Sequence, residues 1–433
     1  MTVQAFRGSI LHYLDDPTTH PDSAREYFDD GILLLKNGKV LAVGDYQNLV
    51  ERIPADAIRK DYSGKLIMPG FVDMHTHYPQ TEIIAAYGKQ LLDWLNNYTF
   101  PTESKFYHYD YAKTVAEIFI EELLKNGTTT AMVFTTVHPQ STHAFFDTAW
   151  EQDLRMIAGK VMMDRNAPDY LLDTPESSYE ESARLIEEWH GKGRLSYAVT
   201  PRFAPTSSPM QLHYAGRLLA EYPDVYLQSH LAENKDELAW VASLFPDAHD
   251  YLNAYEQAGL LGPKSIYAHG IHLSDSACQR LAQSGSVLAH CPTSNLFLGS
   301  GLFQMSRMTD HGVRFALGTD IGGGTSFSML RTMAEAYKVQ QLQGHSLHPD
   351  NAFYHATLGG AKALSLDHCI GNFLPGKEAD FIVLDPSTTP LMHFRIEHCQ
   401  DITEKLFVFA TLGDDRLILA TYILGHLLYH KEH

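Results

Sequence analysis

The sequence predicts an α/β fold, a (β/α)8 barrel of the TIM type with a small β-sandwich domain formed by the N- and C-terminal segments. Three observations predict this fold. The middle of the chain alternates short apolar strands with amphipathic helical stretches, both ends are rich in β-forming residues, and 433 residues exceed the roughly 250 that such a barrel takes. We therefore expect a small β domain from residues 1–67 and 371–433, and a barrel from residues 68–370.

The two ends of the chain are typical of β structure. Residues 32–44, ILLLKNGKVLAVG, contain two β-rich runs around Asn37-Gly38, a dipeptide that favours a tight hairpin turn. Residues 371–385 and 416–430 are again β-rich, with turn residues between them. Two β-rich ends around a different middle predict that the termini meet in one small domain.

The middle of the chain contains eight strand candidates, each short and apolar. They are FVDMHTH (71–77), TTAMVFTT (129–136), MIAGKVMM (156–163), LSYAVTPR (195–202), VYLQSH (225–230), SIYAH (265–269), SVLAH (286–290) and RFALGTD (314–320). Eight βα units that close on themselves form a barrel whose active site lies at the carboxyl ends of its strands. An open doubly wound sheet is the alternative, and it is disfavoured because no G-x-G-x-x-G follows the first strand.

Capping patterns between the strands predict where several helices begin and end. They are Asp110 as the cap of a helix that ends at Asn126-Gly127, a capping box of Ser178 with Glu181, and Ser208-Pro209-x-Gln211 with proline at the first helical position.

The charge balance and the cysteines limit the classes of partner and compartment. Lys and Arg total 33 against 52 Asp and Glu, and the formal net charge of −19 would repel a phosphate backbone or an anionic membrane. We therefore expect no nucleic-acid partner and no membrane partner. The 4 cysteines form no C-x-x-C pair, and the sequence shows neither a signal-peptide pattern nor a run of about 18 apolar residues. A cytoplasmic protein fits these observations.

Residues of the types that commonly bind metal ions stand at the ends of several strand candidates. His75 and His77 are two residues apart, so both side chains can point to one side of their strand. The others are His230 with Glu233 three residues later, His269, and Asp320 in the run ALGTD before the glycine-rich turn IGGG. Together they predict three or more protein ligands around an ion with an open position for water, which is the requirement of a catalytic zinc site.

Each of these residues also has a purely structural explanation. The pair His75 and His77 alone also fits a surface or packing role, and Asp320 also fits the N-cap of the following helix. His230 or His269 alone is more often structural than a ligand. Their occurrence together at four different strand ends favours the metal site.

The motifs PGFVDMHTH (69–77), SHLAE (229–233), YAHG (267–270) and LGTD (317–320), in this order, resemble the amidohydrolase superfamily. The resemblance covers essentially the whole chain, because GNFLPGKEADFIVLD also looks like the family's return into its small β domain. It implies one Zn²⁺ ion per chain, although iron also suits such ligands. The implied site residues are the metal ligands His75, His77, His230 and Asp320, the proton shuttle Glu233, and His269 in contact with the metal-bound water, with Asp320 also catalytic.

The fourth strand bears on the number of metal ions. Family members with two metals carry a bridging modified lysine at its end, whereas this chain runs there into Thr200-Pro201-Arg202-Phe203. The resemblance therefore implies the mononuclear, deaminase-like branch.

Three further segments are similar to the guanine deaminase family: Gln80 after the histidine pair, LLDWLNNYTFPTE (91–103) and TPRFAPT (200–206). In that family these segments surround the purine, which implies the substrate-binding residues Gln80, Trp94, Leu95, Arg202 and Phe203. A buried core aromatic is the alternative for Trp94, and a strand-end salt bridge is the alternative for Arg202. The resemblance implies hydrolytic deamination of guanine to xanthine and ammonia by a homodimer.

Two other functions remain open at the level of sequence. One is deamination or dechlorination of a different amino-heterocycle, since the metal motif fixes the reaction type and not the substrate. Gln80, Trp94 and Arg202 favour guanine over that alternative. The other is a non-catalytic barrel used as a binding or scaffold protein, and the complete ligand set with Glu233 disfavours it.

Overall fold

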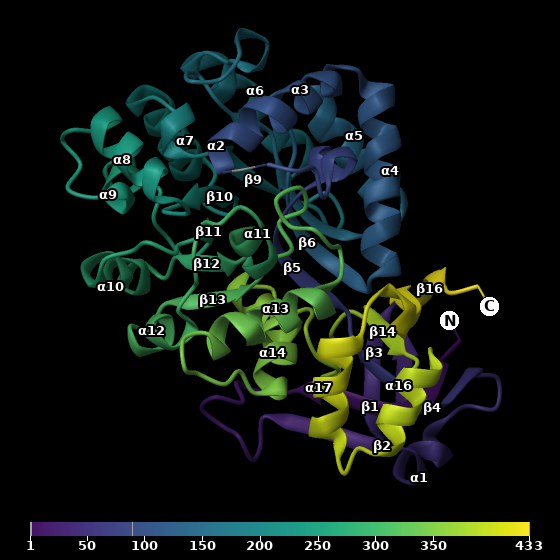
Figure 1. The fold of residues 1–433 in the computed structure, drawn as a ribbon. Helices are drawn as coiled ribbons and strands as arrows, with labels where there is room; N and C mark the ends of the chain where they lie inside the picture. Colours follow the sequence, from purple (N-terminus) through teal and green to yellow (C-terminus); the bar gives the residue numbers. More distant parts are fainter. Residues whose placement is uncertain (1, 89, 433) are drawn as a thin grey trace.

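Strands from both ends of the chain pair in one sheet, and the strands between them form a barrel (Figure 1). The computed structural model describes residues 2–88 and 90–432. Residues 1 and 433, the outermost residues of the expected small domain, lie outside the described residues. Within those residues, no helix combines the length and the apolar composition that crossing a bilayer requires.

The barrel strands are parallel and follow one another around the ring in chain order. They are β5 (Phe71–His77), β6 (Thr128–Phe134), β7 (Arg155–Gly159), β8 (Val161–Met162), β9 (Ser196–Pro201), β10 (Tyr226–Leu231), β11 (Ser265–His269), β12 (Val287–His290) and β13 (Arg314–Leu317). Neighbours pair from β5 to β13 in this order, except that β8 pairs only with β9. The backbone N–H of Asp320 donates to the carbonyl of His75 at 2.8 Å, which joins the end of β13 to β5. The predicted strands are thus confirmed, with the third one split into β7 and β8 at Lys160.

Helices surround the barrel on its outside (Figure 1). They are α4 (Tyr109–Lys125), α5 (Pro139–Glu151), α6 (Pro175–Trp189), α7 (Pro209–Glu221), α8 (Lys235–Leu244), α9 (Tyr251–Gln257), α10 (Asp275–Ser284), α11 (Pro292–Phe297), α12 (Met305–Asp310), α13 (Met329–Gln341), α14 (Pro349–His355) and α15 (Leu358–Ala363). The Ser208 hydroxyl caps α7 by accepting from the Gln211 N–H at 3.1 Å, as predicted. Helix α4 ends before Asn126-Gly127, also as predicted.

Two predicted helix starts are wrong. Helix α4 begins earlier than expected, so Asp110 lies in its first turn, where a carboxylate still interacts favourably with the helix dipole. Helix α6 begins directly after Thr174, whose side chain forms a capping box with Ser177, and Ser178 and Glu181 therefore lie inside the helix. The proline after Thr174 determines this start, because its fixed φ and missing N–H suit the first helical position.

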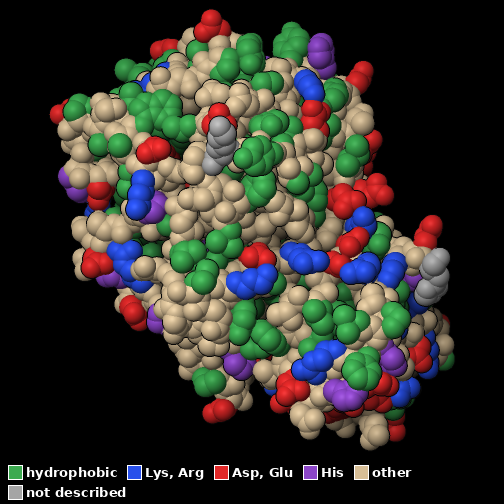
Figure 2. Space-filling view, in the orientation of Figure 1, with side chains coloured by type: hydrophobic (Ala, Val, Ile, Leu, Met, Phe, Trp, Pro, Cys, Tyr) green, Lys and Arg blue, Asp and Glu red, His purple; other side chains and the backbone are tan. Residues whose placement is uncertain are grey.

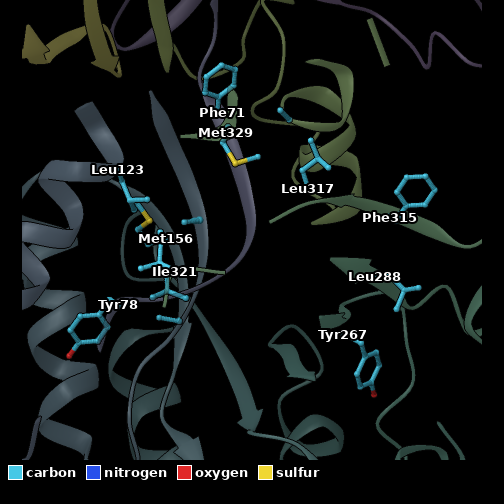
Figure 3. Packing of buried hydrophobic residues seen from close by; sticks show 14 of the residues in the cluster. Phe71, Tyr78, Leu123, Met156, Tyr267, Leu288, Phe315, Leu317, Ile321 and Met329 are labelled. Carbon is cyan, nitrogen blue, oxygen red and sulfur yellow. The ribbon is translucent and has the colours of Figure 1, made fainter. Parts of the chain in front are cut away.

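Buried apolar side chains fill the space between the strands and the helices (Figure 3). Leu123 of α4, Met156 of β7 and Tyr78 beyond β5 belong to one such cluster, and each is fully buried. Both faces of the strands are covered, since a second cluster, with Val72 and Ile266, fills the inside of the ring. This burial explains why the strands are continuous apolar runs without alternation.

The small sheet contains segments from both chain ends, as predicted. Its order is β16 (His426–His430), β15 (Ile418–Ile423), β14 (Phe381–Leu384), β4 (Ile58–Pro69), β1 (Gln4–Tyr13), β2 (Arg25–Lys36) and β3 (Lys39–Asp45). Asn37 and Gly38 turn between β2 and β3 with φ values of 55° and 73°, the positive values that the expected tight hairpin requires. These strands form one continuous sheet, because β1 pairs with β2 on one side and with β4 on the other, and the sheet folds over on itself so that Phe6 of β1 contacts Tyr422 of β15. The division of the chain at residues 67 and 371 stays a prediction.

Two helices follow β14, between the two C-terminal segments that we expected to be β-rich. They are α16 (Pro390–Glu397) and α17 (Ile402–Leu412). Helix α17 packs against α13 and α14, so the C-terminal segment also covers the barrel (Figure 1).

Candidate active site

The four predicted metal ligands converge at the carboxyl ends of the barrel strands. Nε2 of His77 lies 3.1 Å from Nε2 of His75 and 3.2 Å from Nε2 of His230. Oδ1 of Asp320 lies 3.2 Å from Nε2 of His75 and 3.3 Å from that of His77. One donor atom from each residue lies within 4.8 Å of all the others, which is close enough for a common cation.

An irregularity in β5 makes this convergence possible. Val72 and Met74 pack inside the ring, whereas His75 and His77 reach the donor cluster. A regular strand cannot place two even and two odd positions on one face. The pairing of β5 with β6 shifts register between Asp73 and Thr76, and this shift changes the face on which the odd residues lie.

The imidazoles are held in the neutral form that metal ligation requires. Burial lowers the pKa of His75, lowers that of His77 to about 3, and lowers that of His230 well below its usual value. Nδ1 of His230 lies 2.7 Å from the carbonyl oxygen of Arg202, to which it can donate its proton. That contact leaves Nε2 of His230 free to face the cluster.

Glu233 and His269 lie beside the cluster as two neighbouring titratable groups. Oε2 of Glu233 is 3.4 Å from Nε2 of His269, and Oε1 accepts from the Ser300 hydroxyl at 2.8 Å. Burial raises the pKa of Glu233 to about 7. Burial lowers the pKa of His269, but Glu233 and Asp320 outweigh it and raise that pKa overall. Nδ1 of His269 is fixed by Oδ1 of Asn295 at 2.8 Å, so its other nitrogen faces Glu233.

The backbone at this end of the barrel adopts sparsely populated conformations. Ala232, His269 and Asp320 have φ values of 50°, 72° and 52°, which non-glycine residues seldom adopt. Each of them follows or ends a barrel strand. Strain of this kind, concentrated at strand ends that carry polar side chains, is typical of functional sites.

The cluster lies in the wall of a pocket. All of the expected purine-binding residues line it. The lining comprises His77, Gln80, Leu91, Trp94, Leu95, Arg202, Phe203, His230, Glu233, His269, Leu298, Asp320 and Gly323. The pocket therefore joins the candidate ligands and the candidate purine contacts in one space, with His75 behind its wall.

Trp94, Leu95 and Gln80 reach this pocket from the segment that follows β5. Gln80 lies in the short helix η2 (Tyr78–Ile83), and Trp94 ends α2 (Leu91–Trp94). Trp94 is both a buried aromatic and a pocket residue, and its contact with a purine stays a prediction. The glycine-rich turn after Asp320 packs against Gln80, since a Cβ on Gly322 would lie 1.9 Å from its Oε1.

Arg202 lines the pocket and also forms the salt bridge that was its alternative explanation. Its Nη1 donates to both carboxylate oxygens of Glu103 at 2.9 and 2.8 Å. Glu103 ends the short helix α3 (Phe100–Glu103), which continues α2 through the π turn η3 (Leu95–Thr99).

Several supporting side chains were missed in the sequence. Asn295 and Ser300 follow the end of β12, so the rule that polar groups gather at strand ends was the signal that could have found them. The Glu237 carboxylate accepts the backbone N–H groups of Glu233 and Asn234 at 2.9 and 3.1 Å. Glu103 is separated from Arg202 by 99 positions, and nothing local in the sequence connects them.

The comparisons with known proteins agree with this geometry. Residues 66–428 match the model of the amidohydrolase family. The chain is 56% identical over 435 residues to guanine deaminase from Escherichia coli (strain K12), covering 100% of this chain and 99% of that protein. The chain belongs to the guanine deaminases of the amidohydrolase family.

Solved structures of this family have the same fold. The structure of E. coli guanine deaminase matches with a TM-score of 0.97 at 55% identity, over 99% of this chain and 100% of that one. The structure of guanine deaminase from C. acetobutylicum, with guanine bound in its active site, matches with a TM-score of 0.89 at 31% identity, again over 99% and 100%.

Proposed function

We propose that this member of the family hydrolyses guanine to xanthine and ammonia with one divalent metal ion per chain. One observation carries the proposal: the His and Asp cluster with Glu233 lies beside a pocket that Arg202 and Gln80 line. The guanine-bound relative, similar over nearly the whole chain, supports the choice of substrate.

The donor set fits a cation of the zinc class. Neighbouring donor atoms in the cluster are 3.1 to 3.3 Å apart. Four ligands about 2.0 Å from one ion in a tetrahedral arrangement would be roughly 3.3 Å from one another. His75, His77, His230 and Asp320 would hold the ion. When bound, it supplies Lewis-acid activation of the attacking water.

Glu233 moves the proton in this proposal. Its carboxylate takes a proton from the attacking water and delivers it to the ring nitrogen beside the carbon that bears the amine. That protonation makes the carbon electrophilic. A pKa near 7 allows the same group to accept and to donate at neutral pH.

His269 and Asp320 complete the proton transfers. Nε2 of His269, 3.8 Å from Oδ2 of Asp320, faces the space where negative charge develops on the oxygen of the tetrahedral adduct. Asp320 passes the remaining hydroxyl proton to the departing amine, which leaves as ammonia. The products are xanthine and ammonia, so the atoms of guanine and one water are accounted for.

Arg202 and Phe203 determine the substrate in this proposal. The guanidinium donates in plane to the carbonyl of guanine, and Phe203 offers its ring to the flat purine. Adenine carries an amine at that position. The binding of adenine, which would place a donor opposite the guanidinium, would be weaker by about 1 to 3 kcal/mol.

Ammonia release from guanine, adenine, cytosine and an amino-triazine tests the proposal on protein of measured metal content. We expect guanine to have the highest kcat/KM. Preference for another amino-heterocycle would make the protein a different deaminase, and no turnover of any compound by the metal-loaded protein would favour a binding role.

A homodimer in the cytoplasm is part of the same proposal. Among the described residues Cys278, Cys291, Cys369 and Cys399 are all free, as in a reducing compartment. Acidic side chains are interspersed with basic ones on the face shown in Figure 2, and the net charge of −19 supports the absence of a nucleic-acid partner.

A further inference from the structure

The ion pair between Arg202 and Glu103 is unusually well buried. Among the Lys and Arg ion pairs of residues 2–88 and 90–432, only in this pair are both side chains 3% exposed or less, at 3% and 1%. Burying two charges costs several kcal/mol for each ion, and good geometry at best repays that cost. A pair of this kind is therefore weak evidence for stability, and its place in the pocket wall calls for another explanation.

The contacts of Arg202 leave part of its donor fork available. Only Nη1 is engaged by Glu103, at 2.9 and 2.8 Å from the two carboxylate oxygens. The guanidinium carbon lies 5.7 Å from the ring centroid of Phe100, three positions before Glu103 on α3. One short helix thus supplies both the charge partner and an aromatic neighbour, which together restrict how the guanidinium can rotate.

Glu103 itself lies outside the pocket. Arg202 lines the pocket, whereas Glu103 does not. Burial raises the pKa of Glu103, while the positive charge of Arg202 and its hydrogen bonds oppose that rise. Glu103 therefore lies behind the polar group that would face the purine.

The path of the chain explains how Glu103 comes to lie there. Helix α2, which carries Trp94, continues through the π turn η3 into α3 without a break. A π turn is wider than an α turn, so it changes the direction in which later residues point relative to earlier ones. The π turn lets one continuous helical segment present Trp94 and Leu95 to the pocket and Glu103 to Arg202.

We infer that Glu103 is a specificity-determining positioning residue, which orients the Arg202 fork toward the carbonyl of the bound purine and compensates its charge. This inference rests on the proposed function and deepens it. Glu103 acts through Arg202 and does not touch the substrate itself.

Glu103→Gln tests the inference because it keeps the size of the side chain and removes its charge. One of its two terminal atoms becomes a donor that faces Nη1, so the guanidinium must turn. We expect KM for guanine to rise about tenfold or more, with kcat within about threefold and metal content unchanged. In the Arg202→Ala background the same substitution should raise KM no further.

Glu378→Gln is the matched control. It removes a carboxylate that pairs with Arg155 and Arg194 at 2.6 and 2.7 Å. None of these three residues lines the pocket. We expect a lower melting temperature with an unchanged KM. A Glu103→Gln variant that behaves in the same way would overturn the inference, because its role would then be structural.

Binding of unreactive purines separates this inference from the proposed function. Hypoxanthine has the carbonyl and unsubstituted purine lacks it, and neither carries an amine to be released. Dissociation constants can be measured by calorimetry. The wild type should bind hypoxanthine more tightly than purine, and Glu103→Gln should lose most of that preference. A preserved preference would refute the inference, whereas absence of guanine turnover by the wild type would refute only the proposed function. If Glu103→Gln does not fold, Glu103→Asp, which withdraws the carboxylate by one methylene, should show the same loss of preference.

Discussion

Oε2 of Glu233 lies 3.4 Å from Nε2 of His269, and hydrogen bonds to neighbouring side chains hold both residues in place. Glu237 accepts the N–H of Glu233 at 2.9 Å, and Asn295 fixes the far side of the His269 ring at 2.8 Å. Two titratable groups with fixed orientations, one with its pKa raised to about 7, lie next to the candidate cation site, where proton transfer can be tested.

Replacing Glu233 with glutamine should therefore abolish most of the turnover. The amide keeps the size of the side chain but cannot carry the proton, and general acid–base groups contribute roughly 10² to 10⁴-fold. Steady-state rates with guanine, together with metal content, provide the measurement. Glu180→Gln, on the exposed side of α6, is the control that should keep full activity. Near wild-type rates in Glu233→Gln would exclude this residue as the proton shuttle.

Activity should fall on the acid side of neutrality with the titration of one group. Glu233 must be ionised to take a proton from water, so kcat/KM decreases as the pH falls through its pKa. Burial raises this pKa to about 7 and a bound cation lowers it, which places the midpoint at or below about 7. A pH profile of kcat/KM measures it. Constant activity from pH 8 down to pH 4 would contradict this assignment.

One metal ion per chain should be required for activity. Elemental analysis of purified protein should find about one equivalent of zinc or iron, because the cluster offers one set of four donors. Removal with a chelator should abolish turnover, and one added equivalent should restore it. A reproducible content of two ions per chain would overturn the mononuclear interpretation.

Replacing Arg202 with alanine should impair both guanine selectivity and stability. Loss of a charge-assisted hydrogen bond removes about 1.5 to 3 kcal/mol of transition-state stabilisation, which lowers kcat/KM for guanine roughly 10 to 150-fold. Glu103 then stays buried without a partner, which lowers the free energy of unfolding by about 3 to 5 kcal/mol. Kinetics with guanine and adenine, and denaturant unfolding, measure the two effects. Arg202→Lys should recover little, because one ammonium cannot reproduce the planar fork; unchanged guanine kinetics would refute the substrate contact.

Gly322→Ala should disturb the pocket through Gln80. The new Cβ would lie 1.9 Å from Oε1 of Gln80, so the side chain must move, at a cost of about 1 to 3 kcal/mol. We expect a higher KM for guanine. Gly344→Ala is the control, since Gly344 also has a positive φ, of +76°, but open space around it. Equal effects of the two variants on KM would show that backbone strain, and not Gln80, is responsible.

The sequence by itself determined the barrel strands and the metal-site residues. Strand ends in a parallel barrel meet at one end, so the polar residues at four strand ends could be expected to lie together, and the family resemblance then implied His75, His77, His230 and Asp320 as the ligand set. The hairpin at Asn37-Gly38 followed from local backbone preferences. These features depend on residues near in sequence or on one general rule of topology.

The tertiary structure decided what depends on contacts between distant segments. Whether Arg202 forms a salt bridge was open in the sequence, and the structure shows that it pairs with Glu103 across 99 positions while it lines the pocket; its contact with the substrate stays a prediction. The single small sheet depended on which strands lie on the two sides of β1, and the π turn after Trp94 depended on the packing around it. No local pattern encodes such choices, because the energy that selects them comes from burial and from partners that only the folded chain supplies.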